Sequence, residues 1–113
     1  MLCQCKELLH LKIEADFGAD PIWCYQCGYN LDIESLPLSD SLKKELIVWV
    51  LDIEKWYDWE TGQLIKSKRH LAHQHNQLGK ILTDKIKQEL DPSLTVTFVP
   101  FQTIIYFPYR GQL

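Results

Sequence analysis

Hydrophobic and polar residues alternate between positions 9 and 16. The apolar positions are Leu9, Leu11, Ile13 and Ala15. A period of two predicts a β-strand with one buried face, and the turn residues at 17–21 end that strand.

The apolar positions change to a helical period after residue 39. Large apolar side chains recur at spacings of mostly three and four, at Leu42, Leu46, Trp49, Val50, Ile53, Trp56 and Tyr57. Such a stripe predicts a helix over residues 40–59 that turns one side to the core. Ser39 or Ser41 can cap its start, and Gly62 is a suitable residue to end it.

The same helix carries a second apolar patch on its far side, formed by Ile47, Val48, Leu51 and Trp59. A helix that is apolar on two sides is either enclosed by the fold or forms half of an interface. We expect this patch to be buried within the domain, with a homodimer interface as the alternative. Trp59 lies off the main stripe, and if it is exposed it is a candidate binding hot spot.

A second helix is predicted to begin between Gln63 and Lys68 and to end near Leu90, where residues 91–93 stop it. Its apolar stripe consists of Leu71, His75, Leu78, Leu82, Ile86 and Leu90. Gly79 weakens the helix by up to about 1 kcal/mol relative to Ala, and we expect it to let another element approach closely. The opposite face is basic, with Lys66, Arg69, His73, Lys80 and Lys87.

Two short segments rich in β-branched and aromatic residues follow, at 95–99 and 103–107. Both are typical of strands, and the second is apolar on both faces, which favours a central position in a sheet. The element order predicts an α+β fold with a small, mainly antiparallel sheet, two packed helices and an N-terminal cysteine knuckle. A length of 113 residues is typical of one domain, in which residues 1–35 form the strand and knuckle, 36–91 the helices and 92–113 the last strands.

All four cysteines fall in two close pairs, Cys3 with Cys5 and Cys24 with Cys27. In Cys24-x-x-Cys27 the intervening turn brings both sulfurs to one side, and Gly28 accepts a backbone conformation that a Cβ would hinder. In a reducing compartment, clustered cysteines are more often metal ligands or redox groups than structural disulfides. Two pairs make the four-thiolate set of a closed structural site, so we predict that all four bind one metal ion.

The segment from Cys24 to Gly28 resembles the knuckle of zinc ribbons and rubredoxin-like domains, and Cys3-Gln4-Cys5 resembles it more loosely because its spacing is shorter. The resemblance implies Zn²⁺, with iron as the main variant, since thiolates alone do not separate the two. The whole chain also resembles small uncharacterised proteins of Gram-positive bacteria, a resemblance that implies no activity.

Trp23-Cys24-x-x-Cys27 also resembles the motif of thioredoxin-type oxidoreductases, in which the first cysteine sits at a helix N-terminus that lowers its pKa. Residues 28–37 make a poor helix start, and a redox pair leaves the other two cysteines unexplained. A thiol oxidoreductase through Cys24 and Cys27 is therefore an alternative. With a metal in place, Trp23 is interpreted as an aromatic lid that shields the ion from water.

Other candidate chemistry is weaker. His70, His73 and His75 lie close together, but His75 falls on the apolar stripe whereas the other two face outward. We interpret them as surface and core histidines. The sequence has no Gly-rich phosphate loop, no Gly-x-Ser-x-Gly and no His-Glu-x-x-His, so we expect no catalysis.

The net charge of −3 is unevenly distributed: residues 1–62 contain 5 Lys and 12 acidic residues, and residues 63–113 contain 7 basic and 3 acidic residues. Either the two halves attract each other, or the basic half meets an anionic partner. A nucleic acid bound on the basic face of the second helix is therefore an alternative function, although the acidic surroundings of the cysteines would repel phosphates.

No apolar run approaches the roughly 18 residues that span a bilayer, and the N-terminus has no apolar signal core. We therefore expect a cytoplasmic protein without a membrane partner. The sequence predicts a zinc-stabilised domain that works by binding another macromolecule, for which a protein is favoured over a nucleic acid. It does not identify that partner.

Overall fold

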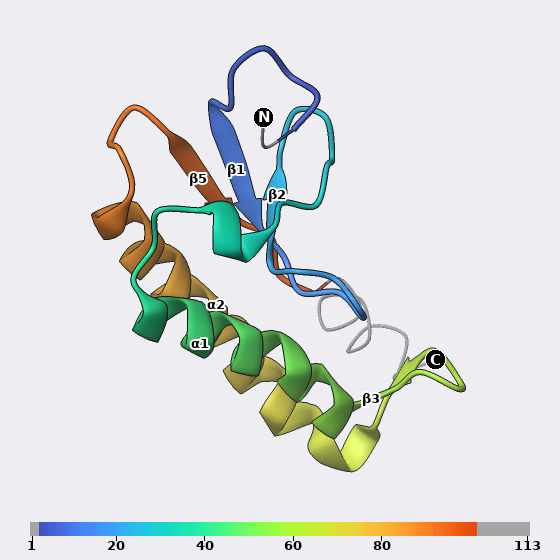
Figure 1. The fold of residues 1–113 in the computed structure, drawn as a ribbon. Helices are drawn as coiled ribbons and strands as arrows, with labels where there is room; N and C mark the ends of the chain where they lie inside the picture. Colours follow the sequence, from blue (N-terminus) through green and yellow to red (C-terminus); the bar gives the residue numbers. More distant parts are fainter. Residues whose placement is uncertain (1–2, 102–113) are drawn as a thin grey trace.

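The structure, a computed structural model, describes residues 3–101 (Figure 1). Three strands form the main sheet: β1 (His10–Ile13), β2 (Ile22–Cys24) and β5 (Thr95–Phe98). β1 lies in the middle, antiparallel to β2 and parallel to β5. The main sheet therefore has one antiparallel and one parallel strand pair, because the helices between β2 and β5 return the chain to the end of the sheet at which β1 begins.

The alternation predicted for the first strand is present. Leu11 and Ile13 are fully buried, whereas His10 and Lys12 are only half-buried on the other face. Leu11 pairs with Cys24 on one side and with Val96 on the other. The strand predicted at 103–107 lies outside the described residues.

α1 (Asp40–Leu51) begins where its sequence predicts. Ser39 is the N-cap, and its Oγ accepts a hydrogen bond from the Leu42 N–H at 3.3 Å. The prediction that this helix continues to Trp59 is wrong. After Leu51 the chain forms a 3-10 turn, η2 (Asp52–Lys55), and then a hairpin of β3 (Tyr57–Asp58) and β4 (Gln63–Leu64).

Two features of the sequence account for this error. Ile53 and Trp56 are both buried at a spacing of three, which a 3-10 turn satisfies as well as an α-helix does. Gly62 has a φ of +71° and serves the β3–β4 turn instead of a helix end.

α2 (Arg69–Glu89) follows the 3-10 turn η3 (Lys66–Lys68) and ends as predicted. Gly79 lies at the closest approach of three elements. A Cβ at this position would overlap the Phe98 ring of β5 and lie 2.8 Å from Cζ2 of Trp49 in α1. The expected close approach at Gly79 is therefore confirmed.

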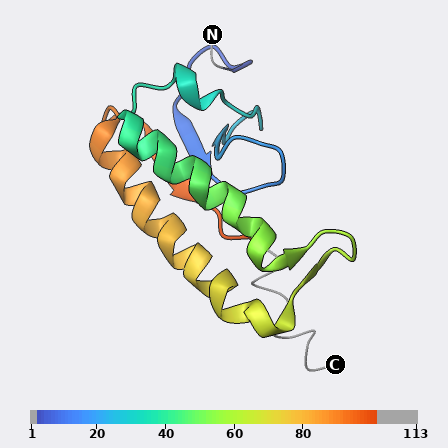
Figure 2. The ribbon, with the colours of Figure 1, turned by 60° about the horizontal axis from the view of Figure 1, so that its bottom comes forward.

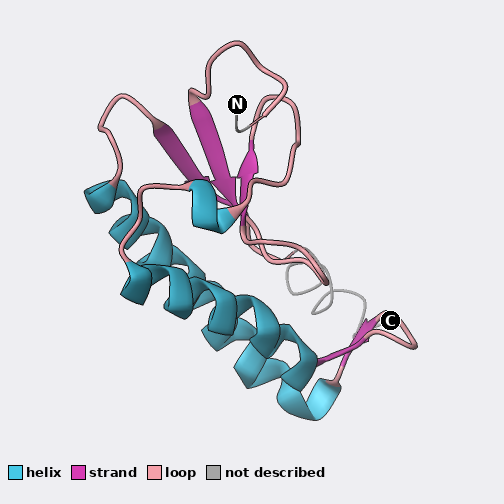
Figure 3. Ribbon diagram, viewed as in Figure 1, coloured by secondary structure: helices cyan, strands magenta, loops and turns pink. Residues whose placement is uncertain are grey.

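The two helices lie side by side and cover one face of the sheet (Figures 1 and 2). Figure 3 shows the two layers, helices on one side and strands on the other. Leu11, Ile13 and Ile22 from the sheet and Leu46, Trp49, Leu82 and Ile86 from the helices belong to one buried cluster. The α+β class is thus confirmed, and none of the described helices is long and apolar enough to cross a membrane.

The predicted burial of the second apolar patch of α1 is wrong. Val48, Leu51 and Trp59 are exposed by 58%, 61% and 73%, and only Ile47 is partly buried. The physical reason is the layering: the sheet covers one side of the helix pair, and no described element covers the other side.

Candidate functional site

The four cysteines converge at one end of the sheet. Cys24 ends β2, Cys27 lies in the turn that follows, and Cys3 and Cys5 come from the N-terminal segment. All four sulfurs lie within 4.8 Å of one another, and the Sγ atoms of Cys5 and Cys24 are 3.9 Å apart. The structure therefore brings together the four residues that the sequence pairs, although 18 residues of chain separate the two pairs.

The turn after β2 is closed by its backbone. The Gly28 N–H donates to the Cys24 carbonyl at 2.9 Å, and the Cys24 N–H donates to the Tyr29 carbonyl at 2.9 Å. Gly28 has a φ of +78°, a conformation that a side chain would strain. This turn presents Cys27 beside Cys24, as the Cys-x-x-Cys-Gly pattern predicts.

The neighbouring thiols shift one another's pKa values. Burial and the neighbouring sulfurs raise the pKa of Cys5 to about 12. The backbone N–H groups of Gln4 and Tyr29 donate to Cys27 and lower its pKa to about 6. For Cys3 the Cys5 N–H acts to lower the pKa, but burial and Cys24 together raise it. Crowded thiolates repel one another, so this site favours either retained protons or a cation that replaces them.

The geometry suits a metal with four sulfur ligands. Tetrahedral bonds of about 2.3 Å place sulfurs about 3.8 Å apart, close to the 3.9 Å between Cys5 and Cys24. All four cysteines are free thiols rather than disulfides. Cys24 is buried, Cys3 and Cys5 are partly buried, and Cys27 is exposed. The cluster could hold a metal ion, and sulfur ligands alone do not identify it.

Trp23 does not cover the sulfurs. It lies between Ile22 and Cys24 in β2, so its side chain leaves the opposite face of the strand. Its Nε1–H donates to the Glu14 carbonyl at 2.9 Å, and the Lys12 ammonium lies 5.5 Å from the ring centroid. The interpretation of Trp23 as a lid is therefore wrong.

The surroundings of Cys24 also differ from those of a thioredoxin-type site. This residue ends a strand, and the turn after it leads back to a bridge between Trp23 and Asn30. The next helical element is the three-residue 3-10 turn η1 (Ile33–Ser35). Cys24 is thus not at a helix N-terminus, the position that activates the attacking cysteine in that chemistry.

The three neighbouring histidines do not converge. His70 and His73 are exposed, whereas His75 is 5% exposed and stacks on Trp49 with 4.5 Å between ring centroids. Burial lowers the pKa of His75 to about 4, so the ring is neutral. Lys80 and Lys87 on the basic face of α2 are exposed to solvent, as is Lys66 in η3.

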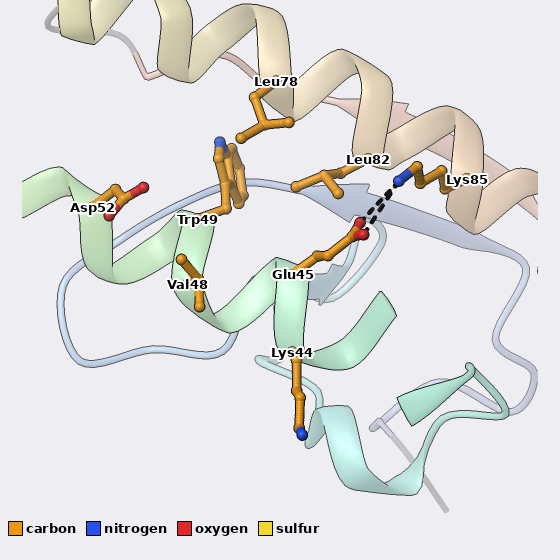
Figure 4. Close-up of a pocket in the computed structure, with 8 residues that line it drawn as sticks. All are labelled: Lys44, Glu45, Val48, Trp49, Asp52, Leu78, Leu82 and Lys85. Carbon is orange, nitrogen blue, oxygen red and sulfur yellow. Dashed lines mark hydrogen bonds and ion pairs between the residues drawn. The ribbon is translucent and has the colours of Figure 1, made fainter. Parts of the chain in front are cut away.

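A groove follows the outer side of the α1–α2 contact and encloses a volume of about 400 Å³ (Figure 4). Val48, Trp49, Leu78 and Leu82 line it, and Ile81 beside it is 53% exposed. An ion pair of 3.0 Å between Lys85 and Glu45 bridges the two helices at one end. The sequence pattern identifies the apolar residues of α1 here but predicts Leu78 to be core, because periodicity does not show which side a neighbouring layer covers.

The β3–β4 hairpin carries a second, partly exposed aromatic surface, in which Trp59 is exposed and Tyr57 is half-buried. Trp59 stacks on Phe17 of the β1–β2 loop with 6.0 Å between ring centroids, and Phe17 lies 5.2 Å from Tyr57. Trp59 was recognised from the sequence as a hot-spot candidate conditional on exposure, and it is exposed. Its contact with Phe17 has no signal in the sequence, since 41 positions separate the two residues.

These features define a small α+β protein with a thiol cluster at one end of its sheet and exposed apolar surface on its helices and hairpin. The chain belongs to the Serratia CdiI immunity protein-like family, which it matches over residues 9–101. No curated protein matches it. Membership of an immunity protein-like family favours a role in protein interaction.

The family match and the thiol cluster are separate observations. The matched part contains Cys24 and Cys27 but begins after Cys3 and Cys5. The match does not support a zinc ribbon, so the resemblance of Cys24–Gly28 to a zinc-ribbon knuckle remains local. A metal at the cysteines and a protein partner therefore need independent tests.

Proposed function

We propose that this chain is an immunity protein that binds a toxin protein and blocks its action. The family match over residues 9–101 carries this proposal. The exposed apolar surfaces on α1, α2 and the hairpin support it, because contiguous exposed apolar surface commonly marks a protein-binding site.

The direct test is neutralisation in cells. The chain is co-expressed with candidate toxin domains, beginning with any that are encoded near its own gene, and growth is compared with cells that express the toxin domain alone. We expect growth to be restored, and the purified toxin domain and this chain to form a complex by calorimetry. A toxin that remains fully active in the presence of excess chain would contradict the proposal.

We further propose that Cys3, Cys5, Cys24 and Cys27 bind one structural Zn²⁺. The spacing of the sulfurs, the left-handed turn at Gly28 and the mutual perturbation of the thiols support it. The ion would fasten the N-terminal segment to the end of β2. All four positions of the ion would be filled by protein sulfur, so it would stabilise the fold and not catalyse a reaction.

Metal analysis of the natively purified protein tests this second proposal. We expect one zinc per chain. Iron in the same stoichiometry would colour the protein and would replace zinc in the proposal, whereas fewer than about 0.1 metal ions per chain would refute the metal site.

A further inference from the structure

Two loops that are distant in the sequence form an aromatic platform, which we define as the exposed Trp59 and the half-buried Phe17 and Tyr57. Phe17 comes from the β1–β2 loop and the other two from the β3–β4 hairpin, and these segments lie side by side (Figures 1 and 2). Trp59 is 73% exposed, the largest fraction among the exposed large hydrophobic residues of the described chain. A tryptophan kept in water forgoes a large amount of burial energy.

The inner side of the aromatic platform contacts further aromatic residues. The Tyr57 ring lies 5.4 Å from Phe101 in an edge-on arrangement, and Phe101 lies 5.1 Å from the buried Trp56. Tyr57 also pairs with Leu64 across the hairpin. The aromatic platform is therefore attached to the core through Tyr57, and the exposure of Trp59 follows from the shape of the hairpin.

The charge around the platform is negative. Asp16 precedes Phe17, and Asp58 and Glu60 flank Trp59 in the chain. None of the ion pairs formed among residues 3–101 involves these three carboxylates. Asp58 is held in place by the N–H groups of Glu60 and Thr61, which donate to its Oδ1 at 3.0 and 3.4 Å. An aromatic surface flanked by uncompensated carboxylates suits a cationic partner.

The groove between α1 and α2 has no such preference for a cationic partner. Its acidic residues are already paired, Glu45 with Lys85 and Asp52 with Lys55. These pairs leave no excess negative charge that would select a basic surface. The groove and the aromatic platform therefore differ in the partner that they suit.

We propose that the aromatic platform is the surface on which this chain docks its toxin, and that the toxin contributes a basic patch with an arginine over the Trp59 ring. The proposal rests on the immunity function proposed above and names its interface. The guanidinium would stack on the indole, while Asp58 and Glu60 would accept its N–H groups. Tryptophan and arginine are the residues that most often dominate such interfaces.

The test uses the full-length chain and the toxin domain of the neutralisation experiment, with affinities measured by calorimetry. Trp59→Ala should weaken binding by about 10-fold or more, as expected of a hot spot. The pair Asp58→Asn and Glu60→Gln should also weaken it and should flatten its dependence on salt. Ile81→Ala, which changes an exposed apolar residue of α2 next to Leu82 of the groove, is the control and should change the affinity less than about threefold.

Three results would overturn this docking surface. The first is wild-type affinity for Trp59→Ala together with a large loss for Ile81→Ala, which would move the interface to the groove. The second is a wild-type chain whose mass in solution is that of a dimer and becomes monomeric in Trp59→Ala, which would make the aromatic platform a contact between copies. The third is a wild-type chain that binds no toxin, and this result alone refutes the immunity function as well. Circular dichroism of each variant establishes that it is folded.

Discussion

The cysteine end of the sheet and the α1–α2 pair are stabilised in different ways. The strands that meet at the cysteines contain three and four residues, and residues 3–8 form no helix or strand. The helix pair has 12 and 21 residues, and Trp49 of α1 stacks on His75 and lies against Gly79 of α2. Where the chain offers few apolar side chains, four sulfurs gather instead. Where it offers many, apolar packing holds the elements together, with the Lys85–Glu45 ion pair and the Ser39–Glu89 hydrogen bond beside it.

The largest expected effect is at the cysteine end. Cys24→Ser, or a strong chelator added to the wild-type chain, should remove the proposed zinc and lower the free energy of unfolding by several kcal/mol, because structural zinc contributes about 10–16 kcal/mol to small metal-binding peptides. Amide hydrogen exchange should rise first at residues 3–8 and in β2, and least in α2. A chelator should not destabilise Cys24→Ser further. Unchanged stability of the chelated wild-type chain would show that packing suffices at both ends.

The second effect concerns pH and the helix pair. His75 has a pKa of about 4 in the fold against its usual 6.5, because burial disfavours the charged ring. The unfolded chain therefore binds a proton that the folded chain does not between these two values, and stability is present in full above pH 6.5 and falls as the pH falls toward 4. The loss approaches about 3 kcal/mol.

His75→Phe is the variant that checks this titration, since it keeps a ring against Trp49. Denaturant unfolding of both proteins from pH 7.5 to 4 should give a shallower pH dependence for His75→Phe. Loss of the proposed metal at acid pH would affect both proteins alike, so the difference between the two curves isolates the histidine. Parallel curves would exclude His75 as the source.

The third effect tests the packing at the helix crossing. Gly79→Ala should destabilise the protein by about 1–3 kcal/mol, because the new Cβ overlaps Phe98 and Trp49. This loss should exceed the gain of about 1 kcal/mol that alanine brings to a helix. Gln77→Ala, on the exposed side of α2, is the control and should change the unfolding midpoint little. A stabilised Gly79→Ala would mean that the crossing has room for a methyl group.

The smallest effect is at the start of α1. Ser39→Ala should cost about 1 kcal/mol, since the Ser39 hydroxyl caps the Leu42 N–H and also donates to Glu89 Oε2 at 2.8 Å, joining the two helices. Ser41→Ala leaves this cap in place and should stay within about 0.5 kcal/mol of the wild type. Equal losses of stability in the two variants, measured by thermal unfolding, would show that the Ser39 cap does not stabilise α1.

The boundaries of α1 and α2 show how far pattern reasoning extends. Ser39 and residues 91–93 mark helix ends through local backbone chemistry, so the start of α1 and the end of α2 were predictable. The far end of α1 was not, because Ile53, Trp56 and Tyr57 repeat at helical spacing while they pack as a 3-10 turn and a hairpin. A spacing of three fits both an α-helix and a 3-10 turn. In the structure, Trp56 and Tyr57 follow the 3-10 turn and pack against Phe101.

The candidate sites also contain features that local sequence predicts and features that it does not. The cysteine pairs and the glycine after Cys27 were recognisable as one set from spacing, since each pair is local. The identity of any partner surface was not, because it depends on which side of α1 the sheet leaves uncovered and on the loop that Trp59 meets.

Local chemistry therefore determined the periods of the strands and helices, the cap at Ser39, the turn at Gly28 and the pairing of the cysteines. The tertiary structure alone decided that Phe17 meets Trp59, that Trp23 faces away from the sulfurs, and that Val48 and Leu51 remain exposed. The physical reason is that the spacing of apolar positions reflects the local backbone conformation of each segment. The burial of a side chain and its neighbours depend on which layer packs against it, and that is set by residues far away in the sequence.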